Sequence, residues 1–181
     1  MKTIPFRPMR PGLTLRPLDT HPEDLPPGEW YLTYKLDDER AVMLPDGSLW
    51  NRQGAPLAKE KAVRFARHAH MACAMLPDET LDVALVGIRR PYQGDFMVLL
   101  DRPDMGVSDY YLRMTATAVP VSLLIGQLSP TLVSRLPIFT WGPDPVFSWT
   151  RKTDHVEGLI GRRANTPYRQ GTSNDMFRSK K

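Results

Sequence analysis

Hydrophobic and polar residues alternate along much of the chain with the two-residue period of a β-strand. In the sequence GEWYLTYKL, the side chains of Leu32, Tyr34 and Leu36 are predicted to share one face. Thr33 and Lys35 are then expected on the opposite face. Similar runs predict further strands at residues 39–44, 49–54, 80–88, 95–101, 155–163 and 174–180. A PDGS turn follows the second strand, so antiparallel pairing is expected there.

A helical period replaces this alternation between Pro56 and Leu76. Apolar residues recur there every three or four positions, and a proline stands near each end of the segment. Between the later strands the pattern is ambiguous. We predict strand, loop and then a short helix over residues 110–128, and turns over residues 137–149. This order of elements predicts an α+β fold with antiparallel sheets.

The length of 181 residues suits one domain. Residues 1–29 are proline-rich and are expected to form an extended lead-in along the surface, with the folded domain at residues 30–181. We expect no signal peptide, because the basic and proline-rich N-terminus has no apolar stretch behind it, and the sequence has no run of about 18 apolar residues. Its single cysteine, Cys73, cannot form an internal disulfide, and no cysteine and histidine cluster has zinc spacing. We therefore expect a cytoplasmic location, with a nucleoid or viral replication site as alternatives.

Positive charge gathers at both ends of the chain. The whole sequence has a formal charge of +4, yet residues 151–181 alone carry eight Lys or Arg against three Asp or Glu. The first 18 residues add four basic residues and no acidic one. Basic segments of this kind suit a polyanion such as nucleic acid or nucleotide phosphates. A solvated basic tail that binds nothing is the alternative.

Lys35 is a candidate for covalent chemistry. Strand alternation places it on the same face as Asp37, and Arg40 follows just beyond the strand. A nucleophilic lysine must lose a proton, although its ordinary pKa is about 10.4. Burial and nearby cations lower that pKa, whereas a carboxylate alone raises it. The alternative is a surface ion pair that contributes about 0–1 kcal/mol.

The segment Lys35–Arg40 resembles the K-x-D-G-x-R signature of the covalent nucleotidyltransferases, above all the ATP-dependent DNA ligases. Further segments resemble later motifs of that family and occur in the same order. They are Arg52–Gly54 (S-R-x-G), Glu79–Gly87 (L-D-G-E-L), Phe96–Asp101, Glu157–Ile160 (E-G-L-V), Tyr168–Gly171 (Y-x-x-G-R) and Met176–Lys180 (K-x-K). Single matches of this kind are weak, but the ordered set covers residues 35–180.

The resemblance implies the chemistry of ATP-dependent DNA ligases. In that family the motif lysine attacks the α-phosphate of ATP, forms a lysyl-AMP phosphoramide and releases pyrophosphate. The AMP then passes to a 5′-phosphate at a nick, and a 3′-hydroxyl displaces it. Lys35 is the implied nucleophile, with ATP and Mg²⁺ as the implied substrate and metal. Nicked DNA, or another nucleic acid, is the implied partner, in DNA repair or replication.

The same motifs imply further site residues and a fold. Nucleotide contacts are implied for Asp37, Arg40, Arg52, Phe96, Glu157, Arg178 and Lys180. Glu157 is also the implied Mg²⁺ ligand, since carboxylates and phosphates are usual ligands of that ion. DNA contacts are implied for Arg162, Arg163 and Arg169, with solvent as the alternative for the first two. The implied fold is an α+β nucleotidyltransferase, an ATP-grasp-like adenylation domain with two antiparallel sheets flanking a nucleotide cleft and helices outside.

Some positions depart from the family pattern. Asp38 stands where the family keeps a glycine, and Ala84 stands where it keeps a glutamate of the nucleotide and metal site. Leu100 stands where an aromatic ring commonly stacks on the base, so Phe96 or Tyr92 is expected to replace it. Thr33 stands where ligases often select adenine, which leaves GTP open as an alternative to ATP.

The printed sequence stops directly after the last motif, so we expect no OB-fold in it. A partner polypeptide that supplies an OB-fold is one possibility. The departures also keep two other hypotheses open. One is a ligase-like module that binds DNA or nucleotide with weakened or lost catalysis. The other is a basic structural domain whose motif matches are accidental.

Overall fold

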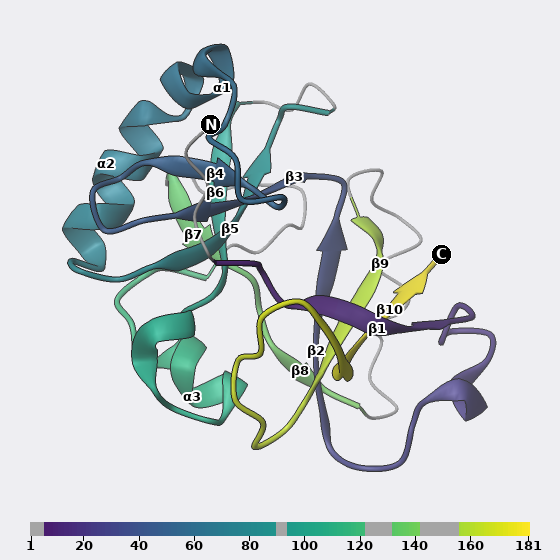
Figure 1. The fold of residues 1–181 in the computed structure, drawn as a ribbon. Coiled ribbons are helices and arrows are strands. Elements are labelled where there is room, and N and C mark those ends of the chain that lie inside the picture. Colours follow the sequence, from purple (N-terminus) through teal and green to yellow (C-terminus); the bar gives the residue numbers. More distant parts are fainter. Residues whose placement is uncertain (1–5, 90–93, 122–131, 142–155) are drawn as a thin grey trace.

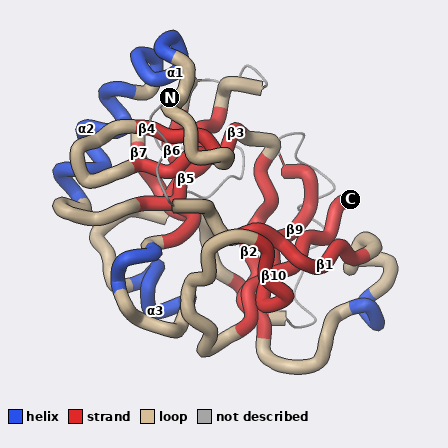
Figure 2. Tube along the Cα trace, in the orientation of Figure 1, coloured by secondary structure: helices blue, strands red, loops and turns tan. Residues whose placement is uncertain are grey.

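Two five-stranded sheets form the framework of the chain (Figures 1 and 2). The computed structural model describes residues 6–89, 94–121, 132–141 and 156–181. The first sheet contains, in spatial order, β1 (Arg10–Leu15), β10 (Thr172–Lys180), β9 (Val156–Arg163), β2 (Trp30–Leu36) and β8 (Phe139–Thr140). The second sheet contains β4 (Leu49–Asn51), β3 (Glu39–Met43), β5 (Leu81–Val86), β6 (Phe96–Asp101) and β7 (Val133–Arg135). The predicted α+β class and the strands predicted from alternation are confirmed.

Both sheets are mixed, whereas antiparallel sheets were predicted. Most neighbouring strands are antiparallel, but β1 pairs in parallel with β10, and β6 pairs in parallel with β7. Parallel neighbours need a long connection, because a tight turn reverses the chain direction. Residues 102–132 provide such a connection between β6 and β7, and nearly the whole chain separates β1 from β10. Neither pairing follows a local sequence pattern.

The helices are short. The predicted helix is present as α1 (Lys59–Arg64) and α2 (Ala66–Met75), with a break at the buried Phe65. A third helix, α3 (Tyr110–Thr115), begins where we predicted a strand. The Asp109 side chain caps it by accepting a hydrogen bond from the Leu112 N–H, which favours a helix start at this point.

Single 3-10 turns are present at Pro22–Asp24 and Pro103–Met105. Residues 122–128 of the predicted strand, loop and helix, and residues 142–149 of the predicted turns, lie outside the described part. No helix in the described residues is long and apolar enough to cross a membrane.

Two hydrophobic clusters hold the layers together. One lies between the helices and the outer face of the second sheet, where Phe65 and Ala69 pack with Val83 and Leu85. The other lies between the sheets and contains Leu32, Tyr34 and Leu36 of β2 with Ala84, Val86 and Val98. The alternation read from β2 therefore gave its buried face correctly. Burial of these side chains is the main favourable contribution to the free energy of folding.

The lead-in is part of the first sheet. Residues 10–15 form the edge strand β1, which pairs with β10 with an irregularity between Pro11 and Leu13. The carboxylate of Asp24 accepts two hydrogen bonds from the Arg16 guanidinium, which follows β1. Leu18 is buried in the cluster between the sheets. The N-terminal segment thus lies close to the C-terminal strand, as Figure 1 shows.

Candidate active site

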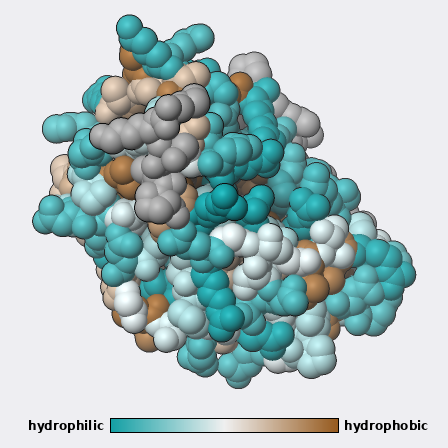
Figure 3. All heavy atoms as spheres, viewed as in Figure 1, coloured by the Kyte–Doolittle hydropathy of each residue, from teal (hydrophilic) through white to brown (hydrophobic). Residues whose placement is uncertain are grey.

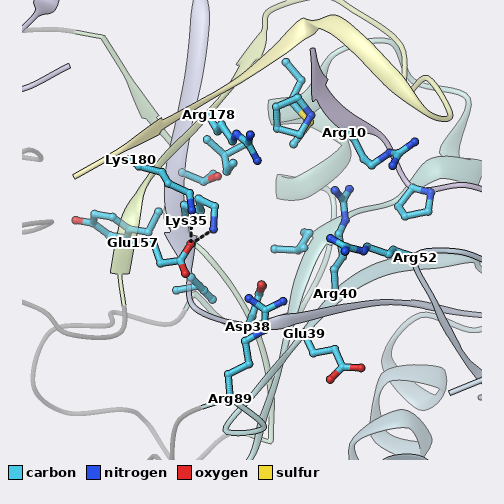
Figure 4. Close-up of a pocket in the computed structure, with 18 of the residues that line it drawn as sticks. Arg10, Lys35, Asp38, Glu39, Arg40, Arg52, Arg89, Glu157, Arg178 and Lys180 are labelled. Atoms are coloured by element: carbon cyan, nitrogen blue, oxygen red, sulfur yellow. Dashed lines mark hydrogen bonds and ion pairs between the residues drawn. The ribbon is translucent and has the colours of Figure 1, made fainter. Parts of the chain in front are cut away.

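Many of the side chains that line a cleft of about 720 Å³ are charged. Basic residues outnumber acidic residues among them: Arg10, Lys35, Arg40, Arg52, Arg89, Arg178 and Lys180 against Asp38, Glu39 and Glu157 (Figure 4). Apolar side chains also contribute, among them Leu100, Ile160 and Met176. Hydrophilic side chains predominate on the face of the molecule seen in Figure 3. The lining suits an anionic ligand that also has an apolar part.

Lys35 lies at one end of this cleft and contacts Glu157. Its Nζ atom donates a hydrogen bond to Oε2 of Glu157, and 20% of the lysine side chain is exposed. The residue lies on the face of β2 opposite the core residues Leu32 and Tyr34. Because the cleft residues come from both sheets, Lys35 is enclosed more than an ordinary surface lysine. The structure therefore gives it both a carboxylate partner and cationic neighbours.

A bulge in β9 brings Glu157 to Lys35. Lys35 is opposite Gly158 while Leu36 is opposite Val156, so Glu157 has no partner in the β2 ladder. Gly158 has a φ of +148°, which strongly favours glycine. A Cβ atom at this position would lie 2.0 Å from the carbonyl oxygen of Ser179. The backbone thus requires glycine at position 158, and the bulge directs the Glu157 carboxylate into the cleft.

Glu157 is an anion at neutral pH. Burial acts to raise the pKa of its carboxyl group, but the hydrogen bond and charge of Lys35 outweigh burial and lower the pKa below its ordinary value. Lys180 adds a second cation, with its Nζ atom 4.0 Å from Oε2 of Glu157. One carboxylate therefore lies between two lysines at this end of the cleft (Figure 4).

The buried carboxylate of Asp82 holds the Arg40 side chain. Its Nε atom donates to Oδ1 of Asp82 at 2.8 Å, and its Nη2 atom donates to Oδ2. Asp82 is fully buried and also accepts a hydrogen bond of 2.7 Å from the Tyr168 hydroxyl. Burial, followed by the charge of Asp82, raises the pKa of Tyr168, so the hydroxyl remains a neutral donor. Asp82 and Tyr168 thereby fix the direction of the Arg40 guanidinium.

Asp38 brings a carboxyl group into the cleft where the family signature has glycine. Burial raises its pKa to about 6, against the opposing charges of Lys35 and Arg40. The backbone at Asp38 does not have a positive φ, so this position has no conformational need for glycine. The departure from the signature therefore changes charge rather than backbone conformation.

The other predicted cations of the cleft come from a turn and from β10. Arg52 lies in a turn that Asn51 stabilises, because Oδ1 of Asn51 accepts hydrogen bonds from the Gln53 and Ala55 N–H groups. Arg178 and Lys180 are two residues apart on β10 and share its cleft-facing side. Nε of Arg178 donates to Oγ1 of Thr14 on β1 at 3.0 Å.

Two predicted nucleotide contacts do not line the cleft. Phe96 lies at the start of β6, whereas Leu100, near the end of the same strand, lines the cleft. At about 3.3 Å per strand residue, some 13 Å separate them. Phe96 packs instead against the cluster between the sheets, and Tyr92 lies outside the described residues. Asp37 lies beside the cleft, with Oδ1 3.6 Å from Nη1 of Arg89.

The three arginines expected at DNA occupy different environments. Only 4% of Arg162 is exposed, and its guanidinium lies 4.3 Å from the centre of the Tyr110 ring. Arg163 lies over the Trp30 ring and is 36% exposed. Arg169 is 60% exposed. The burial of Arg162 disfavours a DNA contact there, and the DNA contacts of all three arginines stay predictions.

The structure also adds cleft residues that we did not predict. Pro8, Arg10 and Pro11 come from the proline-rich lead-in, and Arg89 follows β5. Parallel pairing of β1 with β10 brings the first three to the cleft. The excess of basic residues in the first 18 positions suggested an anion-binding role for this segment. It did not show that the segment reaches the cleft.

Comparison with known proteins identifies the fold. No family model matches the chain, and no curated protein matches it in sequence. A solved structure of a Lig E DNA ligase is similar over 95% of this chain, with 19% identity and a TM-score of 0.56. The ligase domain of M. tuberculosis LigD is similar over 97% of this chain, with 14% identity and a TM-score of 0.63. The Chlorella virus DNA ligase-adenylate is similar over 97%, with 15% identity and a TM-score of 0.58.

The chain spans 69%, 59% and 67% of those three structures, respectively. It therefore has the fold of the adenylation domain of DNA ligases, at low sequence identity.

Proposed function

We propose that this chain is an adenylyltransferase of the ATP-dependent DNA ligase type, with Lys35 as the residue that becomes linked to AMP. The observation that carries the proposal is the position of Lys35, which faces Glu157 in a cationic cleft. The fold shared with DNA ligases supports the same reaction class. The proposal extends to nicked DNA as the acceptor of the AMP.

The proposed step is a substitution at phosphorus. Lys35 Nζ releases a proton to solvent water and attacks the α-phosphorus of ATP, so that an N–P bond forms. The bond from that phosphorus to the bridging oxygen breaks, and pyrophosphate leaves with the electron pair. Arg178 and Lys180, which line the cleft, would offset the charge that develops on the phosphate oxygens. Arg40, which Asp82 holds, would contact ribose or phosphate oxygens.

The residues present fit a magnesium ion that is held mainly by the nucleotide. Mg²⁺ in such sites commonly binds one or two carboxylates together with substrate phosphates. Glu157 supplies an ionised carboxylate in the cleft, and no group of three or more potential metal ligands occurs within the described residues. When bound, the ion would neutralise phosphate charge. Its contact with Glu157 would also compete with the Lys35–Glu157 ion pair.

A second candidate function is nucleotide or DNA binding without adenylyl transfer. Ala84, which replaces the family glutamate, is fully buried between the sheets and presents no carboxylate to the cleft. Asp38 places an additional negative charge near the phosphate site above about pH 6. Both features depart from the family's catalytic motifs, which favours a binding role without transfer.

Labelling with α-labelled ATP and Mg²⁺ tests the proposal. We expect wild-type protein to acquire an acid-labile, alkali-stable label, because a phosphoramide has that stability. Lys35→Ala should give no label above background. Lys61→Ala is a matched control, since Lys61 is also ion-paired with a glutamate but does not line the cleft.

Two results would contradict the proposal. A label that persists in Lys35→Ala would exclude Lys35 as the attachment site. Wild-type protein that binds ATP but stays unlabelled across a wide range of pH and divalent metals would favour the second candidate.

A further inference from the structure

We infer that Arg10, on the N-terminal strand, forms a second phosphate site with Arg52 at the end of the cleft away from Lys35. This distal phosphate site would take a phosphate group other than the one that Lys35 attacks. A role for this site in adenylyl transfer rests on the proposed function. The inference itself is only that the site binds a phosphate group.

The backbone that carries Arg10 is firmly attached to the loop before β10. The Arg7 N–H donates to Oε1 of Gln170 at 2.8 Å, and the Arg10 N–H donates to the Gly171 carbonyl at 2.7 Å. Between them, the Met9 N–H donates to the Tyr168 hydroxyl at 2.8 Å, and Met9 is 3% exposed. The ordered position of this segment makes it a wall of the cleft rather than a loose lead-in.

The same hydrogen bonds connect the N-terminal wall to Arg40. The Tyr168 hydroxyl accepts from Met9 and donates to Asp82, and Asp82 holds the Arg40 guanidinium. Arg10 is the next residue after Met9 and lines the cleft, as Arg40 does. These contacts thus connect the N-terminal segment to the part of the cleft that contains Arg40. No sequence motif predicted this connection.

Arg10 and Arg52 differ from Arg16, Arg40 and Arg64, each of which has a carboxylate partner. Within the described residues, no carboxylate lies within ion-pair distance of Arg10 or Arg52. Both side chains are exposed, both line the cleft, and Figure 4 shows both at the end away from Lys35.

Cations in one cleft that are not paired with carboxylates repel one another, and a bound anion reduces that repulsion. The guanidinium group favours phosphate in particular, because its planar fork can donate two parallel hydrogen bonds to two oxygens. The cleft volume of about 720 Å³ exceeds the needs of a single phosphate, so two phosphate positions can be occupied together. The phosphate could come from the terminal groups of the nucleotide or from a nucleic-acid strand.

Equilibrium binding to the full chain tests the site without requiring catalysis. The probes are ATP, inorganic tripolyphosphate, and nicked DNA with either a 5′-phosphate or a 5′-hydroxyl at the nick. The variants are Arg10→Ala and Arg10→Lys. Arg7→Ala is the matched control, because Arg7 lies in the same segment, is exposed and does not line the cleft. Thermal unfolding of each variant verifies that the fold is kept.

We expect Arg10→Ala to weaken binding of at least one probe by about tenfold relative to Arg7→Ala, with Arg10→Lys intermediate. Weaker binding of ATP and tripolyphosphate supports a nucleotide phosphate. Weaker binding confined to nicked DNA with a 5′-phosphate supports a strand phosphate. If Arg10→Ala binds every probe as Arg7→Ala does, the distal phosphate site is refuted.

The same variants in the labelling assay separate this inference from the proposed function. Wild-type protein without label, together with a selective loss of phosphate binding in Arg10→Ala, would reject the transferase and retain the site. Normal labelling with unchanged binding in Arg10→Ala would retain the transferase and reject the site.

Discussion

Asp38 shows how one residue can change the electrostatics of a cleft without changing its backbone. Its carboxyl group lies among Lys35, Arg40 and Arg89, and burial raises its pKa to about 6. Below that pH the group is mostly neutral, and above it the group adds a negative charge near the proposed phosphate site. The raised pKa means that the folded protein binds this proton more tightly than the unfolded chain. The stability that this proton contributes is therefore fully present below about pH 3.8. It is lost as the pH rises from there through about 6.

We expect Asp38→Asn to bind ATP more tightly than wild type at pH 8, by about three- to tenfold, because one repulsive charge is removed. The two proteins should bind ATP equally at pH 5, where Asp38 is mostly protonated. Calorimetric titration across this range measures both affinities. Asp78→Asn, at an exposed position, serves as the control. Tighter binding that is equal at both pH values would show that repulsion by the Asp38 charge is not the cause.

At the scale of single elements, the β9 bulge determines the geometry of the candidate site. Two independent features restrict Gly158: its φ of +148° and the approach of Ser179 and Lys180 to within 3 Å of any added Cβ. Since both neighbours are backbone atoms of β10, they cannot move without disturbing the strand pairing. The position of Glu157 therefore depends on a glycine that has no chemical role itself.

We expect Gly158→Ala to lower the free energy of unfolding by about 2–4 kcal/mol, because strain and steric overlap add. Denaturant unfolding measures this change. Gly106→Ala is the matched control: its φ is +65° and nothing lies within 4 Å of an added Cβ, so only about 1 kcal/mol is expected. Equal losses in the two variants would show that backbone conformation alone restricts Gly158.

At the scale of the whole molecule, a buried ion cluster connects the two sheets. Asp101 of β6 is fully buried and accepts from Nε of Arg113 at 2.8 Å. Nε of Arg162, from β9 in the other sheet, lies 3.6 Å from Oδ2 of Asp101. Arg113 also donates to the carbonyl of Thr166 in the loop after β9. These contacts fix the sheets against each other and so maintain the shape of the cleft.

We expect Arg162→Ala to lower the free energy of unfolding by about 3 kcal/mol, because a buried carboxylate loses a partner. Arg169→Ala should change stability by less than about 0.5 kcal/mol, since the side chain is mostly exposed. If Arg169 contacts a DNA phosphate, its removal should reduce the log–log salt dependence of DNA binding by about 0.9. Denaturant unfolding and salt titrations of DNA binding measure these effects. An unaltered salt slope in Arg169→Ala would remove this residue from the DNA interface.

The sequence by itself determined the local elements and predicted Lys35 as the candidate nucleophile. Alternation identified the buried face of β2, and helical spacing identified residues 56–76, because both patterns depend on neighbours within a few positions. The ordered motifs also predicted several residues that the structure brings into one cleft: Lys35, Arg40, Arg52, Glu157, Arg178 and Lys180. Motif order can do this for the residues that lie on strands, such as Lys35, Arg178 and Lys180, because strand alternation fixes the direction of each side chain.

The tertiary structure decided which residues reach the cleft from outside those motifs. The parallel pairing of β1 with β10 placed Arg10 there, and the packing between the sheets buried Arg162 and left Phe96 outside. Each outcome depends on contacts between segments far apart in the chain, which no local period encodes. Charge predicted a polyanionic ligand, and residue spacing predicted Lys35 as the candidate nucleophile. The pairing of distant strands determined where the charged side chains come together.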